Sequence, residues 1–131
     1  MEFLETDDVL RMHQSIIDTG GGTHGVMAAG AVDAALERCR WGPFHGPGDL
    51  GERAAYLLRG IVQDHPFADG NKRTAFEVAE TFLRRNGWFM AASADDIVKS
   101  MLDAAQGQPV EAIEAWIRAR AKPLSSEGGK P

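Results

Sequence analysis

Apolar residues recur along most of this chain at intervals of three and four positions, which is the spacing of one face of an α-helix. The pattern predicts helices over residues 6–20, 28–40, 52–64, 70–86, 93–105 and 109–121. The stretch 70–86 is apolar on nearly two faces, as is typical of a helix covered on several sides. Residues 88–90 leave room only for a short extended piece. The sequence therefore predicts an all-α fold, a compact bundle of about six helices around a central helix at 70–86.

Two segments lack this helical periodicity. Residues 41–51 contain Pro43 and Pro47 among several glycines, so we expect an irregular excursion there. Residues 123–131 consist mainly of proline, serine, glycine and charged residues, and we expect a disordered tail. The remaining part, residues 1–122, has the length of one domain with its own core.

Composition limits the kinds of function that this chain can have. The net charge of −5 provides no basic excess for bulk binding to nucleic acid or to an anionic membrane. A single cysteine, Cys39, excludes an intrachain disulfide and is typical of a reducing compartment. The sequence opens without a charged-then-apolar leader and contains no apolar run long enough to span a bilayer. We therefore expect a cytoplasmic protein that binds neither nucleic acid nor membrane directly.

The most informative segment is HPFADGNKRTA at residues 65–75. Pro66 disfavours helical geometry at His65, so one helix ends there and the next begins a few residues later. The first N–H groups of a helix lack internal partners, and together with the positive end of the helix dipole they favour a bound anion. Lys72 and Arg73 oppose the dipole in this turn, which makes sense if a polyanion binds above them. The junction is therefore a candidate phosphate-handling site.

Each of these polar residues also has an ordinary structural explanation. His65 can close one helix, Asp69 can cap the next, and Lys72 with Arg73 can be a solvated pair. Their occurrence together within nine positions favours a phosphate site over these separate explanations.

Two other kinds of site fit the sequence less well. The segment GGGTHG at residues 20–25 has dinucleotide-binding spacing, but it follows a helix rather than a strand and lacks the acidic residue needed further on. Val26 and Met27 stand where a P-loop requires lysine and serine or threonine. A zinc site is disfavoured because the four histidines have no zinc-binding spacing and no cysteine pair is present. Of these histidines, His13 lies in an apolar helix, where we expect a hydrogen-bonded structural role.

The motif from His65 to Asn71, followed by Arg73, resembles the signature of the Fic fold. Lys72 and Phe76 replace a glycine and a second arginine of the adenylylating Fic motif, and both changes resemble the death-on-curing (Doc) toxin branch. Gly70 is instead typical of the adenylylating branch. Further features resemble the Doc branch: the chain length, His13, the glycines at 20–22 and the segment 82–87.

The resemblance implies a role for each residue of the motif. His65 would be the general base that removes a proton from the target hydroxyl, and Asp69 would bind Mg²⁺. Phe67 would anchor the loop from inside, as a structural part of the nucleotide site. The remaining residues would handle the phosphates: backbone N–H groups of Gly70 and Asn71 bind their oxygens, Asn71 also orients the loop or the metal shell, and Lys72 and Arg73 neutralise developing charge.

The same resemblance implies a function. The chain would be the toxin of a type II toxin–antitoxin system, a Mg-ATP-dependent kinase that transfers the γ-phosphoryl group to a threonine of translation elongation factor Tu and so arrests translation. A Fic-type adenylyltransferase and a non-catalytic partner-binding scaffold are the alternatives. Residues 41–51 would correspond to the flap against which such enzymes lay the target segment as an added strand.

Control of such an activity would have to come from another protein. Many Fic relatives carry an inhibitory helix with serine or threonine four residues before a glutamate, and the glutamates of this chain lack that spacing. The resemblance implies a small antitoxin that folds as a helix into an apolar groove. Trp116 and Ile117 are candidates to line the groove, although both also suit the core.

Overall fold

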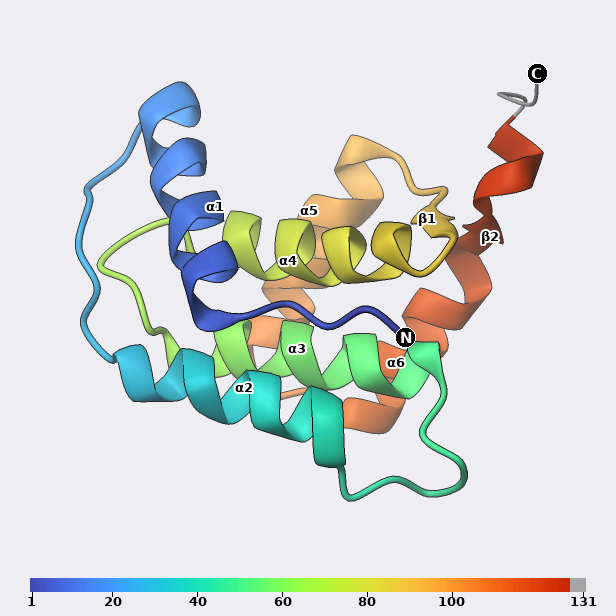
Figure 1. Cartoon of the computed structure of the whole chain (residues 1–131). Helices are drawn as coiled ribbons and strands as arrows, with labels where there is room; N and C mark the ends of the chain where they lie inside the picture. Colours follow the sequence, from blue (N-terminus) through green and yellow to red (C-terminus); the bar gives the residue numbers. More distant parts are fainter. Residues whose placement is uncertain (128–131) are drawn as a thin grey trace.

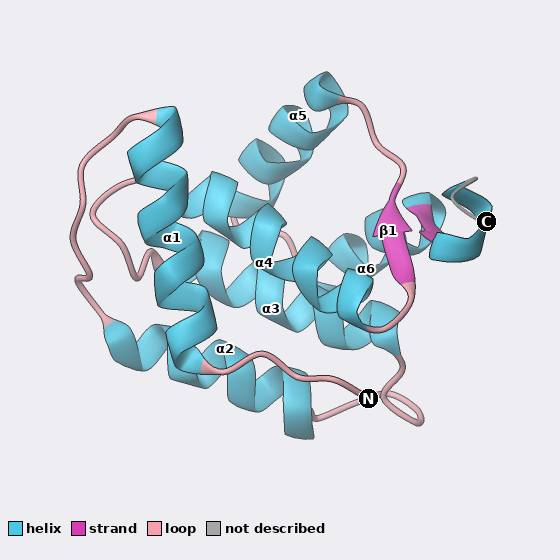
Figure 2. Ribbon diagram, turned by 45° about the horizontal axis from the view of Figure 1, so that its top comes forward, coloured by secondary structure: helices cyan, strands magenta, loops and turns pink. Residues whose placement is uncertain are grey.

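The computed structural model describes residues 1–127, and six α-helices make up most of this part of the chain (Figures 1 and 2). The helices are α1 (Thr6–Gly20), α2 (Ala29–Trp41), α3 (Leu50–Asp64), α4 (Asn71–Arg85), α5 (Ala94–Ala105) and α6 (Val110–Arg120). Two short strands, β1 (Trp88–Met90) and β2 (Ala121–Pro123), and a 3₁₀-helix at Leu124–Glu127 complete it. The predicted all-α bundle is confirmed, and each helix begins and ends within two residues of its expected bounds.

The centre of the bundle is shared by α3 and α4, whereas the sequence predicts a central role for α4 alone. α3 contacts α2, α4, α5 and α6, and its side chains Leu57, Leu58 and Ile61 are completely buried. Small residues permit this close packing: a Cβ atom on Gly60 would lie 2.6 Å from the Cβ of Ala35 in α2. Each buried leucine or isoleucine stabilises the fold by about 2 kcal/mol, so α3 is a rigid base for the loop that follows it.

The chain continues past α6 into ordered structure. β2 pairs antiparallel with β1, with Lys122 opposite Phe89 and Pro123 opposite Trp88. The predicted tail at 123–131 is therefore corrected at its start, where Pro123 belongs to β2 and residues 124–127 form the 3₁₀-helix. Pairing through backbone groups needs no apolar periodicity, which is why the sequence pattern misses it. Residues 128–131 lie outside the described part.

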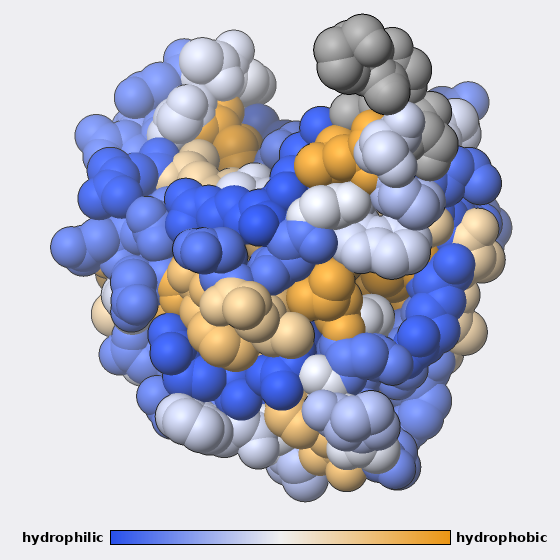
Figure 3. Space-filling model, turned by 45° about the vertical axis from the view of Figure 1, so that its right-hand side comes forward, coloured by the Kyte–Doolittle hydropathy of each residue, from blue (hydrophilic) through white to orange (hydrophobic). Residues whose placement is uncertain are grey.

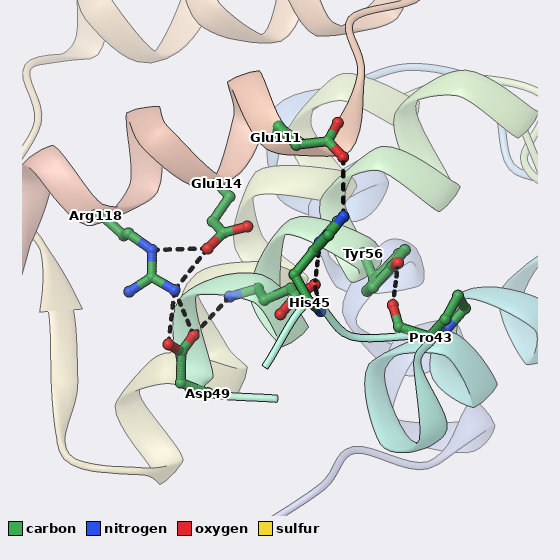
Figure 4. Close-up of polar contacts among 8 residues, drawn as sticks. Pro43, His45, Asp49, Tyr56, Glu111, Glu114 and Arg118 are labelled. Carbon is green, nitrogen blue, oxygen red and sulfur yellow. Dashed lines mark hydrogen bonds and ion pairs between the residues drawn. The ribbon is translucent and has the colours of Figure 1, made fainter. Parts of the chain in front are cut away.

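The irregular loop between α2 and α3 lies at the N-terminal end of α3 (Figures 1 and 4). His45 Nδ1 is 3.1 Å from the buried Glu52 carboxylate, and Asp49 forms an ion pair of 2.6 Å with Arg118 of α6. His65 stands at the other end of α3, about 22 Å away for 15 helical residues. Residues 41–51 therefore lie far from the motif, and the expectation that they form its flap is wrong.

A different loop, residues 21–28, lies against the motif (Figure 1). The backbone N–H of Met27 donates to the carbonyl of Pro66 at 2.7 Å, and the N–H of Ala68 donates to the carbonyl of Gly25 at 3.0 Å. Val26 and Phe67 form an isolated antiparallel bridge. These backbone contacts join the end of α1 to the α3–α4 junction.

The surface on the side of β1 and β2 is mostly hydrophilic, and apolar side chains show there only in separate patches (Figure 3). Within residues 1–127, no helix has the length and apolar character needed to cross a bilayer.

Candidate active site

The candidate site is built on the loop that joins α3 to α4. His65 ends α3 in the left-handed conformation, with φ 48° and ψ 60°, and its N–H donates to the carbonyl of Ile61 at 3.3 Å. This conformation is uncommon for a residue other than glycine, so the surrounding contacts must hold it in place. The next residue, Pro66, is buried, whereas the side chain of His65 is exposed and has no polar partner among the described residues. The imidazole is therefore free to meet a ligand.

Phe67 and Asn71 hold the middle of the loop. The Asn71 side chain accepts a hydrogen bond from the Phe67 N–H at 3.0 Å and donates one to the Phe67 carbonyl at 2.9 Å. The Phe67 ring is buried, with only 2% of its surface exposed, and it stacks on the His13 ring at 3.8 Å between centroids. Asn71 therefore orients the loop, and Phe67 anchors it from the inside.

Asp69 is held by two backbone N–H groups. Its Oδ1 accepts from Gly70 at 2.8 Å, and its Oδ2 accepts from Thr23 at 3.1 Å. These hydrogen bonds, with that from Thr23 the stronger influence, lower the pKa of Asp69 below its usual value, and the nearby charge of Arg73 adds to the effect. The carboxylate is therefore ionised at neutral pH. It suits Mg²⁺, which needs only one or two carboxylates when phosphate oxygens and waters complete its shell.

A transition-metal site built from protein side chains alone needs several of them close together. Within residues 1–127, no three histidine, cysteine, aspartate or glutamate side chains converge on one point.

The N-terminus of α4 has no side-chain cap. Gly70 stands at the N-cap position with φ 77° and ψ 19°, and the first bond inside the helix runs from the N–H of Thr74 to the carbonyl of Gly70 at 2.9 Å. The N–H groups of residues 71–73 have no acceptor in the described part of the chain. Three donors that lack an acceptor among the described residues, at the positive end of a helix dipole, can bind an anion. The expected donor at Gly70 is already engaged by Asp69, so the available ones begin at Asn71.

Lys72 and Arg73 take different positions, although they are adjacent in sequence. The Arg73 guanidinium donates to the carbonyl of Gly21 at 3.0 Å, at the C-terminal end of α1, where a cation is favoured by the dipole. Lys72 is exposed and forms no ion pair within residues 1–127. Lys72 is therefore the freer of the two charges for a bound phosphate.

The glycines at the end of α1 form a wall of the site. A Cβ atom on Gly22 would lie 2.8 Å from Asp69 Oδ2, and one on Gly20 would lie 2.8 Å from an Arg73 nitrogen. The sequence suggests only a helix stop and a turn here. One glycine is enough to end a helix, so the run of three is the feature of the sequence that could have indicated their close contact with Asp69 and Arg73.

His13 on α1 also belongs to this region. It is buried, with 3% of its surface exposed, and its Nε2 lies 2.8 Å from the backbone carbonyl of Asp69. The expected hydrogen bond is present, but its partner is the motif loop.

A groove of about 380 Å³ lies between α4 and α5, and Lys72 and Arg73 form part of its lining. It is lined mainly by apolar side chains, which include Phe76, Ile97, Val98, Met101 and Leu102. Its volume falls within the range of small-molecule sites.

Known proteins are similar to this chain over about two thirds of its length. The sequence model of the Fic/DOC family matches residues 3–83, which include α1 and the whole motif. The chain is 38% identical over 97 residues to Toxin Doc of Mycolicibacterium smegmatis, covering 72% of each protein. It is 33% identical over 88 residues to Protein kinase doc of Escherichia phage P1, covering 66% of this chain and 70% of that protein.

Proposed function

This chain belongs to the Fic/DOC family, and from that premise we propose that it is the toxin of a type II toxin–antitoxin system which transfers the γ-phosphoryl group of ATP to a protein hydroxyl. The names of the two relatives, a toxin and a protein kinase, support both parts of the proposal. In the structure, the observation that carries it is the uncapped N-terminus of α4 beside an ionised carboxylate.

His65 would act as the general base. Its imidazole is exposed and has no polar partner within residues 1–127, so it can take the proton of a threonine hydroxyl as the oxygen forms a bond to the γ-phosphorus. The bond from the γ-phosphorus to the bridging oxygen breaks, and ADP leaves with that electron pair. The protonated imidazole then releases its proton to water.

The phosphate-handling residues would stabilise the transferred group. The N–H groups of residues 71–73 at the helix end would donate to such a group, and Lys72 would supply a positive charge that no described residue pairs with. Asp69 would hold Mg²⁺, which when bound neutralises charge on the phosphates.

Phe76 favours γ-phosphoryl transfer over AMP transfer. It occupies the position of the second arginine in the adenylylating motif, and it is 8% exposed, with its ring against Trp116 at 6.3 Å. An apolar side chain cannot clamp the far phosphates of a nucleotide. The α4–α5 groove has the size and the apolar lining to receive the nucleoside half of ATP.

The protein target is proposed to be translation elongation factor Tu, modified on a threonine, with arrest of translation as the result. Val26 and Met27 present exposed apolar side chains, 49% and 73% accessible, on the loop beside the motif. This loop, rather than residues 41–51, is the better candidate to receive the target segment.

Intact-mass analysis of elongation factor Tu after incubation with this protein and Mg-ATP tests the proposed function. We expect the addition of one phosphate. An addition of one AMP would instead establish the adenylyltransferase. Failure to bind Mg-nucleotide at all would favour the third alternative, a scaffold that binds a partner without catalysis.

A small antitoxin is the proposed partner that keeps the toxin inactive. Of the two candidate groove residues, Ile117 lies in the core and is 1% exposed, whereas Trp116 is partly buried, packs against the core and donates from Nε1 to Asp96 at 3.2 Å. We expect that expression of the protein alone slows growth and that co-expression with the antitoxin restores it. High-level expression without any slowing of growth would contradict the need for an antitoxin.

A further inference from the structure

We propose that His13, which lies outside the motif, is a positioning residue for the phosphate site, because it holds the peptide group between Asp69 and Gly70 in place. The inference rests on the proposed function and extends its machinery from the α3–α4 junction to α1. The sequence suggests only a structural role for this histidine.

Two contacts link His13 to the motif loop. Its Nε2 is 2.8 Å from the carbonyl oxygen of Asp69, and because a carbonyl can only accept, Nε2 carries the proton. Its ring lies parallel to that of Phe67, with 3.8 Å between centroids and 5° between planes. His13 therefore touches the loop on both sides of Ala68, once through the backbone and once through a buried ring.

The peptide group that His13 holds controls both halves of the site. The carbonyl of Asp69 belongs to the same peptide as the N–H of Gly70, and this N–H donates to Asp69 Oδ1 at 2.8 Å. Rotation of the peptide would break the bond to His13 and the bond from Gly70 to Asp69 Oδ1 at the same time, and would leave the carboxylate held only by the N–H of Thr23. It would also shift Gly70 from its N-cap conformation, so the first free N–H, on Asn71, would move as well.

The surrounding packing leaves this peptide little alternative support. The Gly70 Cα faces α1 so closely that a Cβ atom there would lie 2.9 Å from Ile17 Cδ1 and 3.8 Å from His13 Nε2. α1 is thus fitted against the loop at this point, and His13 supplies its hydrogen bond to the loop backbone. Displacement of about 1 Å in a catalytic arrangement can cost about a hundredfold in rate, so the orientation matters for activity.

A pair of substitutions separates positioning from simple packing. In His13→Gln the side-chain amide offers an N–H at similar reach, whereas His13→Met has similar length and volume but no donor. Gln14→Met introduces methionine at the neighbouring, exposed position of α1 and is the matched control. All three proteins, with the wild type, are compared at a temperature at which each is fully folded.

Two readouts are measured. The first is kcat/KM for group transfer from Mg-ATP to the target. The second is the amide NMR signals of Gly70 and Thr23, the two donors to Asp69, in protein without nucleotide. We expect that His13→Met loses at least about tenfold in kcat/KM and shifts both signals. His13→Gln stays within about threefold of the wild type with both signals in place, and Gln14→Met changes neither readout.

The proposal would be overturned if His13→Met had wild-type kcat/KM and unshifted amide signals. It would also be overturned if His13→Gln lost as much kcat/KM as His13→Met, because the hydrogen-bond donor would then be irrelevant. Failure of the proposed function is recognised separately. If the wild type transfers no group, that function is wrong, while the two amide signals in the nucleotide-free protein still decide whether His13 holds the loop.

Discussion

At the scale of single residues, the site depends on places where no side chain fits. Gly22 has φ 125°, and a Cβ atom there would meet Asp69 Oδ2 at 2.8 Å and Ile17 Cδ1 at 3.0 Å. Gly21 also has a positive φ of 86°, but a Cβ atom there would meet no other atom within 4 Å. Both neighbours thus have a backbone conformation that residues with a side chain rarely adopt, and they differ in whether a side chain there would meet the site.

This difference leads to a test of the glycine wall. Gly22→Ala should lower nucleotide binding and transfer activity strongly, because the new methyl group displaces the Asp69 carboxylate. Gly21→Ala should lower only stability, by about 1 kcal/mol, since it adds backbone strain alone. Isothermal titration with Mg-ATP and urea unfolding of both variants provide the comparison. Equal nucleotide binding by the two variants would show that the wall has no part in the site.

The sequence reveals the residue types of the motif but not their partners. The segment from His65 to Arg73 indicates a phosphate site through its residue types and its place between two helices. That Arg73 reaches back to the end of α1, and that the Thr23 N–H donates to Asp69, depends on contacts across about 50 positions of sequence. The apolar periodicity of one segment does not predict contacts with a distant segment.

At the scale of elements, the helices are predictable and their connections are not. Apolar spacing and helix-ending glycines place α1 to α6, because each helix buries a stripe against the others. The α2–α3 loop and the 21–28 loop are both irregular and rich in glycine, so composition alone does not show which one lies beside the motif. The direction of α3 decides this, since it places its two ends at opposite ends of the bundle.

The ion pair between Asp49, at the start of α3, and Arg118 of α6 can be tested through its dependence on pH. The hydrogen-bonded ion pair with Arg118 lowers the pKa of Asp49 below its usual value. A hydrogen bond from the N–H of Glu52 lowers it further, by a smaller amount. A carboxyl group with a depressed folded pKa stabilises the fold above its unfolded pKa of about 3.9, and this stability is lost as the pH falls through the folded value. Asp49→Asn keeps a good helix cap and removes only the charge.

We therefore expect Asp49→Asn to be less stable than the wild type at neutral pH by about 1 kcal/mol or less, because the pair is half exposed. Urea unfolding at a series of pH values measures the difference. The difference should begin to shrink below about pH 4 and should disappear once the pH lies below the folded pKa, where the wild-type carboxyl is protonated. A difference that does not change with pH would mean that the ion pair contributes nothing.

At the scale of the whole molecule, two segments far apart in sequence meet at one end of the bundle: the end of α1 with its following loop, and the α3–α4 junction with the start of α4. The opposite end, where the α2–α3 loop packs on α6, contributes only stability in this account (Figure 4). The matched family region, residues 3–83, contains both of these segments and ends within α4. Activity and fold stability should therefore respond to different sets of substitutions.

The central claim is that His65 and the start of α4 transfer the γ-phosphoryl group of ATP. The most direct test supplies ATP labelled either on the γ-phosphorus or on the α-phosphorus, with Mg²⁺ and elongation factor Tu, to the wild type and to His65→Ala. We predict label on a threonine of the target from γ-labelled ATP only, and its loss in His65→Ala while circular dichroism shows an unchanged helical fold. Transfer of the α-label, or equal labelling by His65→Ala, would contradict the claim.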